Sequence, residues 1–238
     1  MLRQFWLNGQ PVSVELVQKP VKNLNLRIHS NGRITLSVPK GTPKSRIRAF
    51  LTQNAGFVLK TLQKNQGKIC LVPPGACKNS PVYYHGLAKE IRLCAGKPGV
   101  CLQENAVLIF LASPDAPEAA RQADLLLRSF WKKTAQQEFT RFCRLHFSTF
   151  ARKGLAFPSL SFRFMTSRYG SCQPKTGKIT LNLFLLCVEP AAAEAVVVHE
   201  LCHLLHPDHS AAFYRQVEEL LPDYRQRRHL LDRYRLEK

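Results

Sequence analysis

The feature that most constrains the fold of this chain is the segment H-E-L-C-H at residues 199–203. It lies in an apolar stretch that begins at Pro190, reads AAAEAVVVHELCHLL and is broken by Pro207, which predicts one helix. Positions four residues apart stand one above the other on a helix, so His199 and His203 project in the same direction. Two imidazoles arranged in this way suit two ligands of one tetrahedral zinc ion.

Glu200, beside the first imidazole, is the candidate catalytic residue. In an H-E-x-x-H helix the glutamate holds and deprotonates a water molecule whose pKa zinc lowers towards neutrality, rather than binding the metal. The carboxylate then acts as general base and later as proton donor. The alternative is a buried structural helix with hydrogen-bonded histidines. It is disfavoured because two imidazoles and a carboxylate are costly to bury without a purpose.

A catalytic zinc ion usually has three protein ligands and one open position. The candidates for the third ligand all follow the helix: His206, His209, Glu218 and Glu219. Pro207 disfavours helical geometry at residue 206 and turns the chain, after which His209 can return towards the metal. Its separation of six residues from His203 matches the third ligand of metzincins, although the metzincin glycine and downstream methionine are missing. We therefore predict His209 as the third ligand.

Residues 1–114 predict a β-rich region with one helix. Residues 24–38 contain two alternating apolar runs separated by turn formers at 30–32, which is a hairpin signal. Apolar residues then recur at helical spacing between 43 and 62, and short β-type runs with turns fill residues 66–114.

Residues 115–238 predict a mixture of helices and strands. The expected elements are a long amphipathic helix over 117–152, strands at 160–165 and 178–185 joined by a polar loop, the helix from Pro190, and short helices over 210–220 and 223–235. The shift in composition near residue 115 divides the chain into two regions, which are either separate domains or one continuous domain. The predicted fold class is therefore α+β.

The charge of the chain bears on its partners. Thirty-five Lys and Arg residues against sixteen Asp and Glu residues leave a formal net charge of +19. Such a balance favours anionic substrates or polyanions, so nucleic acid is a candidate partner, with a merely solvated basic surface as the alternative.

Apolar runs and cysteines bear on the compartment. No apolar run is long enough to span a bilayer, and the N-terminal residues lack a signal-peptide pattern, so we expect a cytoplasmic protein without a membrane partner. The eight cysteines contain no C-x-x-C pair and are expected to be free thiols. A cysteine zinc site at Cys70/Cys77 or Cys94/Cys101 is disfavoured because both spacings are too wide.

Three segments along the chain carry a family pattern. They read GRITLSVPKG, SRYGSCQPKTGKITLNLFLL, and VVVHELCHLLHPDHSAAF followed by LLPDYRQRRHLL. The chain thereby resembles the YgjP/SprT-like zinc metallopeptidase family, and most closely its YgjP-like branch. The resemblance implies a zincin-like C-terminal half with Zn²⁺ on His199, His203 and His209. It also implies that Glu200 is the catalytic acid and base. One departure is Tyr169, where the family usually has tryptophan.

The SRYGSC segment supplies two candidate substrate-binding residues. Arg168 can bind a substrate carboxylate or phosphate, and Tyr169 can stabilise a developing oxyanion. The alternative is a structural turn in which Gly170 provides backbone freedom and Arg168 pairs with a nearby acid.

Three functions fit these features. The leading one is a zinc-dependent peptidase acting on peptides or proteins; SprT-like relatives act on proteins attached to DNA, which the net charge would suit. The second is a metal-dependent phosphoanhydride hydrolase acting on nucleotides such as nucleoside triphosphates, although no P-loop is present. The third is a non-enzymatic nucleic-acid-binding protein with a structural zinc. It is disfavoured because structural sites have four protein ligands and Cys202 points away from the face shared by His199 and His203.

Overall fold

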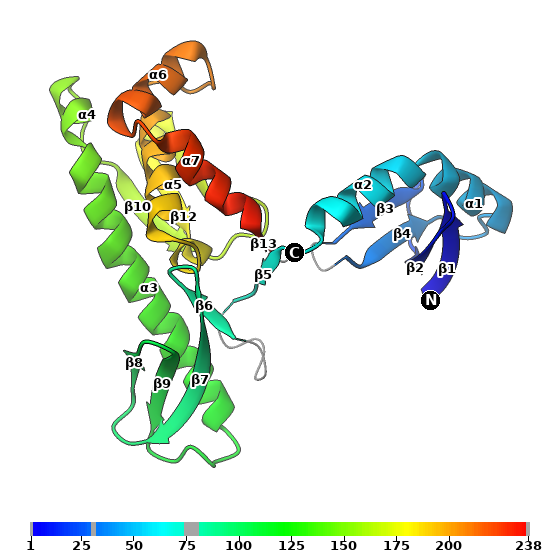
Figure 1. Cartoon of the computed structure of the whole chain (residues 1–238), viewed down its shortest axis with the longest axis horizontal. Helices are drawn as coiled ribbons and strands as arrows, with labels where there is room; N and C mark the ends of the chain where they lie inside the picture. The colour runs from blue at the N-terminus through cyan, green and yellow to red at the C-terminus, as the bar shows by residue number, and fades with distance from the viewer. Residues whose placement is uncertain (1, 30–31, 74–80, 237–238) are drawn as a thin grey trace. The chain divides into compact units, whose positions relative to one another are not determined.

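Four strands and two helices form the first of two units in the computed structural model, which describes residues 2–29, 32–73 and 81–236 (Figure 1). The elements are β1 (Leu2–Leu7), β2 (Gln10–Gln18), β3 (Asn25–Ile28), β4 (Ile34–Val38), α1 (Lys44–Gln53) and α2 (Ala55–Asn65). The sheet order is β1-β2-β4-β3, with β2 and β4 parallel and the other neighbours antiparallel. The predicted hairpin over 24–38 is confirmed as β3 and β4, and its turn residues 30 and 31 lie outside the described residues. The single helix predicted over 43–62 is divided at Asn54.

The two helices pack on one face of this sheet. Residues of β1, β2 and β4 join residues of both helices in one buried cluster: Leu7, Val12, Val14, Ile34, Leu36, Val38, Ile47, Leu51, Ala55 and Val58. Because successive side chains of a strand point to opposite faces, the exposed Leu2 and Trp6 of β1 lie on the other face.

A long helix organises the second unit, Leu71–Leu236. The chain enters it through β5 (Ile69–Leu71) and continues through β6 (Val82–Tyr84), β7 (Leu87–Ala95), β8 (Gly99–Leu102), β9 (Ala106–Leu111) and α3 (Ala119–His146). The four strands after β5 form a sheet of order β6-β7-β9-β8. With 28 residues, α3 is about 42 Å long. It packs first against β8 and β9 and then against later elements, as its course in Figure 1 shows. The compositional shift near residue 115 therefore falls inside this unit, directly before α3.

The remaining elements of the second unit are grouped around the far end of α3. They are α4 (Ser148–Arg152), β10 (Ser159–Arg163), β11 (Gly170–Gln173), β12 (Lys178–Asn182), α5 (Pro190–Cys202), α6 (Ala211–Leu220), α7 (Tyr224–Leu230) and β13 (Tyr234–Leu236). In the sheet β10-β12-β11, β10 is parallel and β11 antiparallel to the central β12. The helix α5 packs against α3, β11, β12, α6 and α7, so it lies at the centre of this half.

The observed elements agree with the predicted mixed α+β class, but two of the predicted elements differ from the observed ones. The polar loop expected before β12 contains the strand β11, and the last predicted helix ends at Leu230 rather than at residue 235. Among the described residues, no helix combines the length and the apolarity needed to cross a bilayer. Seven cysteines are described and all are free; Cys77 lies outside the described residues.

Candidate metal centre

Three histidine side chains converge at the end of α5. The nitrogen atoms of His199, His203 and His209 that could hold a metal ion all lie within 4.8 Å of one another. The Nε2 atom of His199 is 3.2 Å from that of His203 and 3.1 Å from that of His209. The first two residues meet because they are one helical turn apart, whereas His209 returns after the helix has ended at Cys202.

Hydrogen bonds on the outer ring nitrogens orient two of these imidazoles. The Nδ1 atom of His203 lies 3.0 Å from the carbonyl oxygen of His206, which can only accept, so Nδ1 carries the proton and Nε2 has a free lone pair. The Nδ1 atom of His199 lies 2.9 Å from the hydroxyl oxygen of Tyr224, which can accept in the same way. Such outer partners fix the tautomer that presents Nε2 to a metal ion.

A buried phenyl ring supports all three imidazoles. The ring centroid of Phe213, on α6, lies 4.9 Å from that of His199, 4.6 Å from that of His203 and 5.0 Å from that of His209. The side chain of Ser210 caps α6 by accepting from the Phe213 amide, which places this ring at the start of the helix. Burial, followed by the neighbouring His203 and His209, lowers the pKa of His199 to about 3, so its imidazole is neutral near pH 7.

The other candidates for the third ligand lie in different contacts. Glu218 forms an ion pair with Arg225 at 2.9 Å, and Glu219 accepts a hydrogen bond from Gln216 at 3.1 Å. His206 contributes its backbone carbonyl to His203, and its side chain is not part of the described histidine group. The structure thus brings His209 to the first two histidines, as the sequence spacing predicts.

Glu200 lies on α5 beside His199 and is 6% exposed. Burial raises its pKa to about 7, and the positive charge of Arg168 partly opposes this shift. Its carboxyl group packs directly on the backbone of Gly170 in β11: a Cβ atom at this position would lie 2.5 Å from Oε1 of Glu200. Position 170 must therefore be a glycine if the Glu200 carboxylate is to stay packed against β11.

Asn182 holds the segment that leads into β11. It is completely buried at the end of β12. Its Oδ1 accepts from the amides of Met165 and Phe184, while its Nδ2 donates to the carbonyls of Met165 and Arg168, both at 2.7 Å. The backbone N–H of Asn182 also donates a hydrogen bond to the carbonyl of Tyr169, at 2.8 Å. Because every polar atom of this side chain is used, the segment before Gly170 is fixed to the sheet. Asn182 is not among the predicted site residues, and its only signal in the sequence is its place in a strand with an L-N pair.

The two predicted substrate-binding residues are placed differently. Arg168 is exposed and close enough to Glu200 to affect its pKa. Tyr169 is half-buried, and burial raises its pKa, with opposing influence from Arg228. None of the contacts that the described residues provide for Tyr169 reaches the three histidines. Arg228, which is not among the predicted site residues, also lowers the pKa of His199, so a second cation lies near the histidines.

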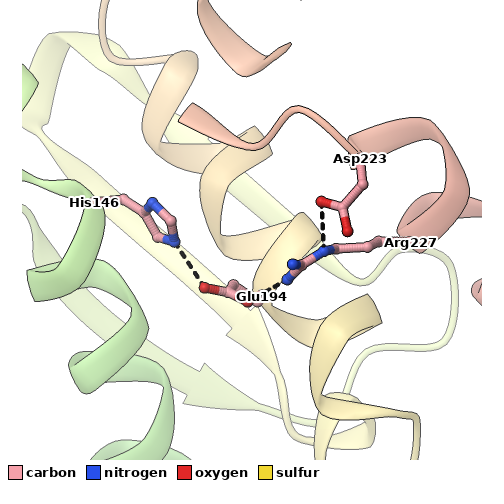
Figure 2. Close-up of polar contacts among 4 residues, drawn as sticks. All are labelled: His146, Glu194, Asp223 and Arg227. Atoms are coloured by element: carbon pink, nitrogen blue, oxygen red, sulfur yellow. Dashed lines mark hydrogen bonds and ion pairs between the residues drawn. The ribbon is translucent and has the colours of Figure 1, made fainter. Parts of the chain in front are cut away.

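A network of polar contacts keeps α7 in place (Figure 2). Glu194, in the middle of α5, accepts from His146 at the end of α3 at 2.8 Å and from Arg227 of α7. Arg227 in turn donates to Asp223 at 2.8 Å. Tyr224 belongs to the same helix, so this network helps to hold its hydroxyl against His199.

The geometry fits a zinc ion. Zinc–nitrogen bonds of about 2.0–2.1 Å in a tetrahedron place two ligand nitrogens about 3.3 Å apart, close to the two separations between Nε2 atoms. Where these Nε2 atoms share no proton, their lone pairs repel one another, and a cation would relieve this repulsion. The donor set of three imidazoles leaves a fourth position open, as in catalytic zinc sites.

Three converging imidazoles, with a buried carboxylate on the helix that supplies two of them, are the kind of site found in metal-dependent hydrolases. Consistent with this class, the family described as YgjP-like, metallopeptidase domain, matches residues 22–234. The chain therefore belongs to the YgjP-like metallopeptidase-domain family, which supports a metal-dependent hydrolase. No curated protein matches the chain.

Proposed function

We propose that this protein is a zinc-dependent peptidase in which His199, His203 and His209 bind the metal and Glu200 is the catalytic acid and base. The observation that carries the proposal is the convergence of three Nε2 atoms at the end of a helix that also carries Glu200, a buried carboxyl group with a pKa of about 7. Membership of a metallopeptidase-domain family supports the same assignment.

The chain's own residues account for the proton transfers. When bound, a zinc ion would polarise the scissile carbonyl and increase the acidity of water in the site. The Glu200 carboxylate accepts a proton from a water molecule as the water oxygen attacks the carbonyl carbon. It then returns this proton to the amide nitrogen as the C–N bond breaks, leaving a carboxyl and an amine. A pKa near 7 suits both steps, because the group then exchanges protons readily at neutral pH.

The position of β11 favours an extended polypeptide as substrate. This strand is the outer one in the order β10-β12-β11, so one of its edges has no strand partner among the described residues. Its first residue, Gly170, touches Glu200. A peptide added along this edge would pass its backbone carbonyls close to the carboxylate, and main-chain hydrogen bonds would bind it with little dependence on sequence.

Two arginines support the second candidate function, which is the hydrolysis of an anionic substrate. Arg168 affects the pKa of Glu200, and Arg228 affects that of His199, so both cations lie near the proposed reaction centre. Guanidinium groups bind phosphates through paired hydrogen bonds. A phosphoanhydride hydrolase acting on nucleotides would use the same carboxylate to activate water.

Metal analysis combined with an activity screen tests the proposal. Wild type is expected to contain about one zinc per chain, and a His199→Ala/His203→Ala variant to contain none. Activity is measured on a casein-type substrate, with and without DNA, and on nucleoside triphosphates. Glu200→Gln is expected to retain zinc and to lose about 10²- to 10⁴-fold in kcat.

His206→Ala is the matched control, because it removes an imidazole of the same segment while keeping the carbonyl that orients His203. It is expected to retain both zinc and activity. Hydrolysis of triphosphates but not of casein would select the second candidate. Wild type without stoichiometric metal, or full activity in Glu200→Gln, would refute the assignment of this site.

A further inference from the structure

The basic charge of the chain is concentrated in its first unit. Residues 1–70 contain a single acidic residue, Glu15. The same stretch contains twelve basic residues: Arg3, Lys19, Lys22, Arg27, Arg33, Lys40, Lys44, Arg46, Arg48, Lys60, Lys64 and Lys68. Glu15 already interacts with Arg33 and Thr35, so it leaves most of this positive charge uncompensated. More than half of the net +19 thus belongs to a unit separate from the candidate metal centre.

This unit contains a hollow between its edge strand and its first helix. A cavity of about 470 Å³ is lined by residues of β1 and α1, among them Arg3, Phe5, Trp6, Lys44 and Arg48. A second hollow is lined by α1 alone. Both hollows share Lys44, Arg48 and Thr52, which are spaced by four residues and therefore form one stripe along the helix.

An exposed aromatic side chain belongs to the strand that borders this basic hollow. Trp6 is 70% exposed, although tryptophan is normally among the most buried residue types on average. It belongs to β1 at the edge of the sheet. Its neighbours in sequence, Phe5 and Leu7, pack towards the core, so the Trp6 ring lies on the face of the sheet opposite α1. Trp6 lies outside residues 22–234, which the family covers, so the family relationship does not account for it.

We propose that the first unit binds single-stranded nucleic acid, with Trp6 stacking on a base and the Lys44–Arg48 stripe contacting phosphates. Sequence-tolerant binding of single strands combines an aromatic platform with a positively charged groove along the backbone. Because β1 is an edge strand, a single strand that passes around this edge reaches both the Trp6 ring on one face and the Lys44–Arg48 stripe on the other. Duplexes fit less well, because their paired bases are not available to stack on an indole.

An anionic membrane surface is the competing occupant, since it also attracts Lys, Arg and Trp. Peripheral membrane helices insert an apolar face into the bilayer. The apolar residues of α1, Ile47 and Leu51, are instead buried in the core of the unit, and its outward face is polar. Cations and an exposed ring on the two faces of one edge strand suit a chain that passes around this edge better than a flat bilayer.

Two measurements on the full chain test this proposal. Fluorescence anisotropy with labelled oligo(dT) and oligo(U) of about 12 nucleotides gives the affinity and its salt dependence. Intrinsic fluorescence reports on the ring itself, because the only other tryptophan, Trp131, is fully buried. We expect oligonucleotides to quench the Trp6 emission. We also expect Trp6→Ala to weaken binding roughly 5- to 150-fold and Trp6→Phe to restore most of it.

Charge variants separate a defined site from diffuse attraction. Lys44→Gln/Arg48→Gln is expected to reduce the slope of log K against log salt by about 1.4, equivalent to about 25-fold weaker binding at 0.1 M salt. The matched control Lys60→Gln/Lys64→Gln removes the same charge from exposed positions of α2 that line neither hollow. Equal losses in both double variants, or no effect of Trp6→Ala, would overturn the proposal.

Two further probes decide the class of ligand. Tighter binding of a DNA duplex than of either single strand would overturn the stacking mechanism. Binding to phosphatidylserine vesicles that neither oligonucleotide displaces would identify the surface as a membrane contact instead. Comparison of oligo(dT) with oligo(U) shows whether the 2′-hydroxyl contributes. The result is independent of the proposed peptidase activity, because the variants lie in the unit that does not contain the three histidines.

Discussion

Replacing Gly170 by alanine gives a direct test of how the proposed catalytic carboxylate is positioned. The added Cβ would lie 2.5, 2.7 and 2.8 Å from the Oε1, Cγ and Cδ atoms of Glu200. Ordinary van der Waals contacts begin near 3.4 Å, so the carboxyl group or β11 must move by about 0.9 Å. Three atoms of one side chain are affected, including Cγ near its base. A rotation of the terminal carboxyl alone therefore cannot relieve the clash.

The size of this displacement sets the expected loss of activity. A shift of about 1 Å in a catalytic group costs roughly 10²-fold in rate, which corresponds to about 2.7 kcal/mol in the activation free energy. We expect Gly170→Ala to lower kcat by about this factor while the zinc content remains at the wild-type value, since the three atoms nearest to the added Cβ all belong to Glu200 and not to a histidine. The free energy of unfolding should fall by about 1–3 kcal/mol from overpacking.

The assay measures kcat on the substrate found in the screen, zinc by elemental analysis and unfolding by circular dichroism. Gly99→Ala is the matched control in the same unit, because the nearest atom to its added Cβ, a backbone oxygen, is 3.9 Å away. It should behave as wild type. If Gly170→Ala kept wild-type kcat and stability, the contact with Glu200 would not position the carboxylate, and our reasoning would be wrong.

Two further predictions concern groups that support the centre. Tyr224→Phe removes the hydroxyl partner of His199 while keeping the ring, and we expect zinc affinity to fall about 10- to 100-fold. The affinity is measured by competition with a chromophoric chelator. Unchanged affinity would show that the hydroxyl does not orient the imidazole. Asn182→Ala leaves the Met165 amide and the carbonyls of Met165 and Arg168 without their buried partner. We therefore expect the free energy of unfolding to fall by about 3 kcal/mol, which lowers the Tm by about 6–12 °C. A Tm within 2 °C of wild type would contradict the anchoring role of Asn182.

Sequence reasoning succeeded where the geometry is local. The direction shared by His199 and His203 follows from the period of the helix, and the hairpin of β3 and β4 follows from alternating apolar residues around turn formers. The long helix α3 was visible because its apolar positions recur over many turns. These features depend on residues only a few positions apart, so one sequence suffices to predict them.

Sequence reasoning failed where an element depends on its partner. The strand β11 has the sequence GSCQ, which has neither β-branched residues nor clear alternation. It becomes a strand because it pairs with the buried β12, to which Asn182 ties the preceding segment.

The sequence by itself therefore determined the chemistry of the candidate centre: two imidazoles and a carboxylate on one helix, and a third imidazole six residues further on. Only the tertiary structure brought Tyr224 to His199, Phe213 under the three rings and Gly170 against Glu200. The physical reason is the separation along the chain of the residues that each contact joins. A helix fixes the relative directions of its own side chains through backbone hydrogen bonds, whereas contacts between distant segments depend on how whole elements pack and bury their apolar surface.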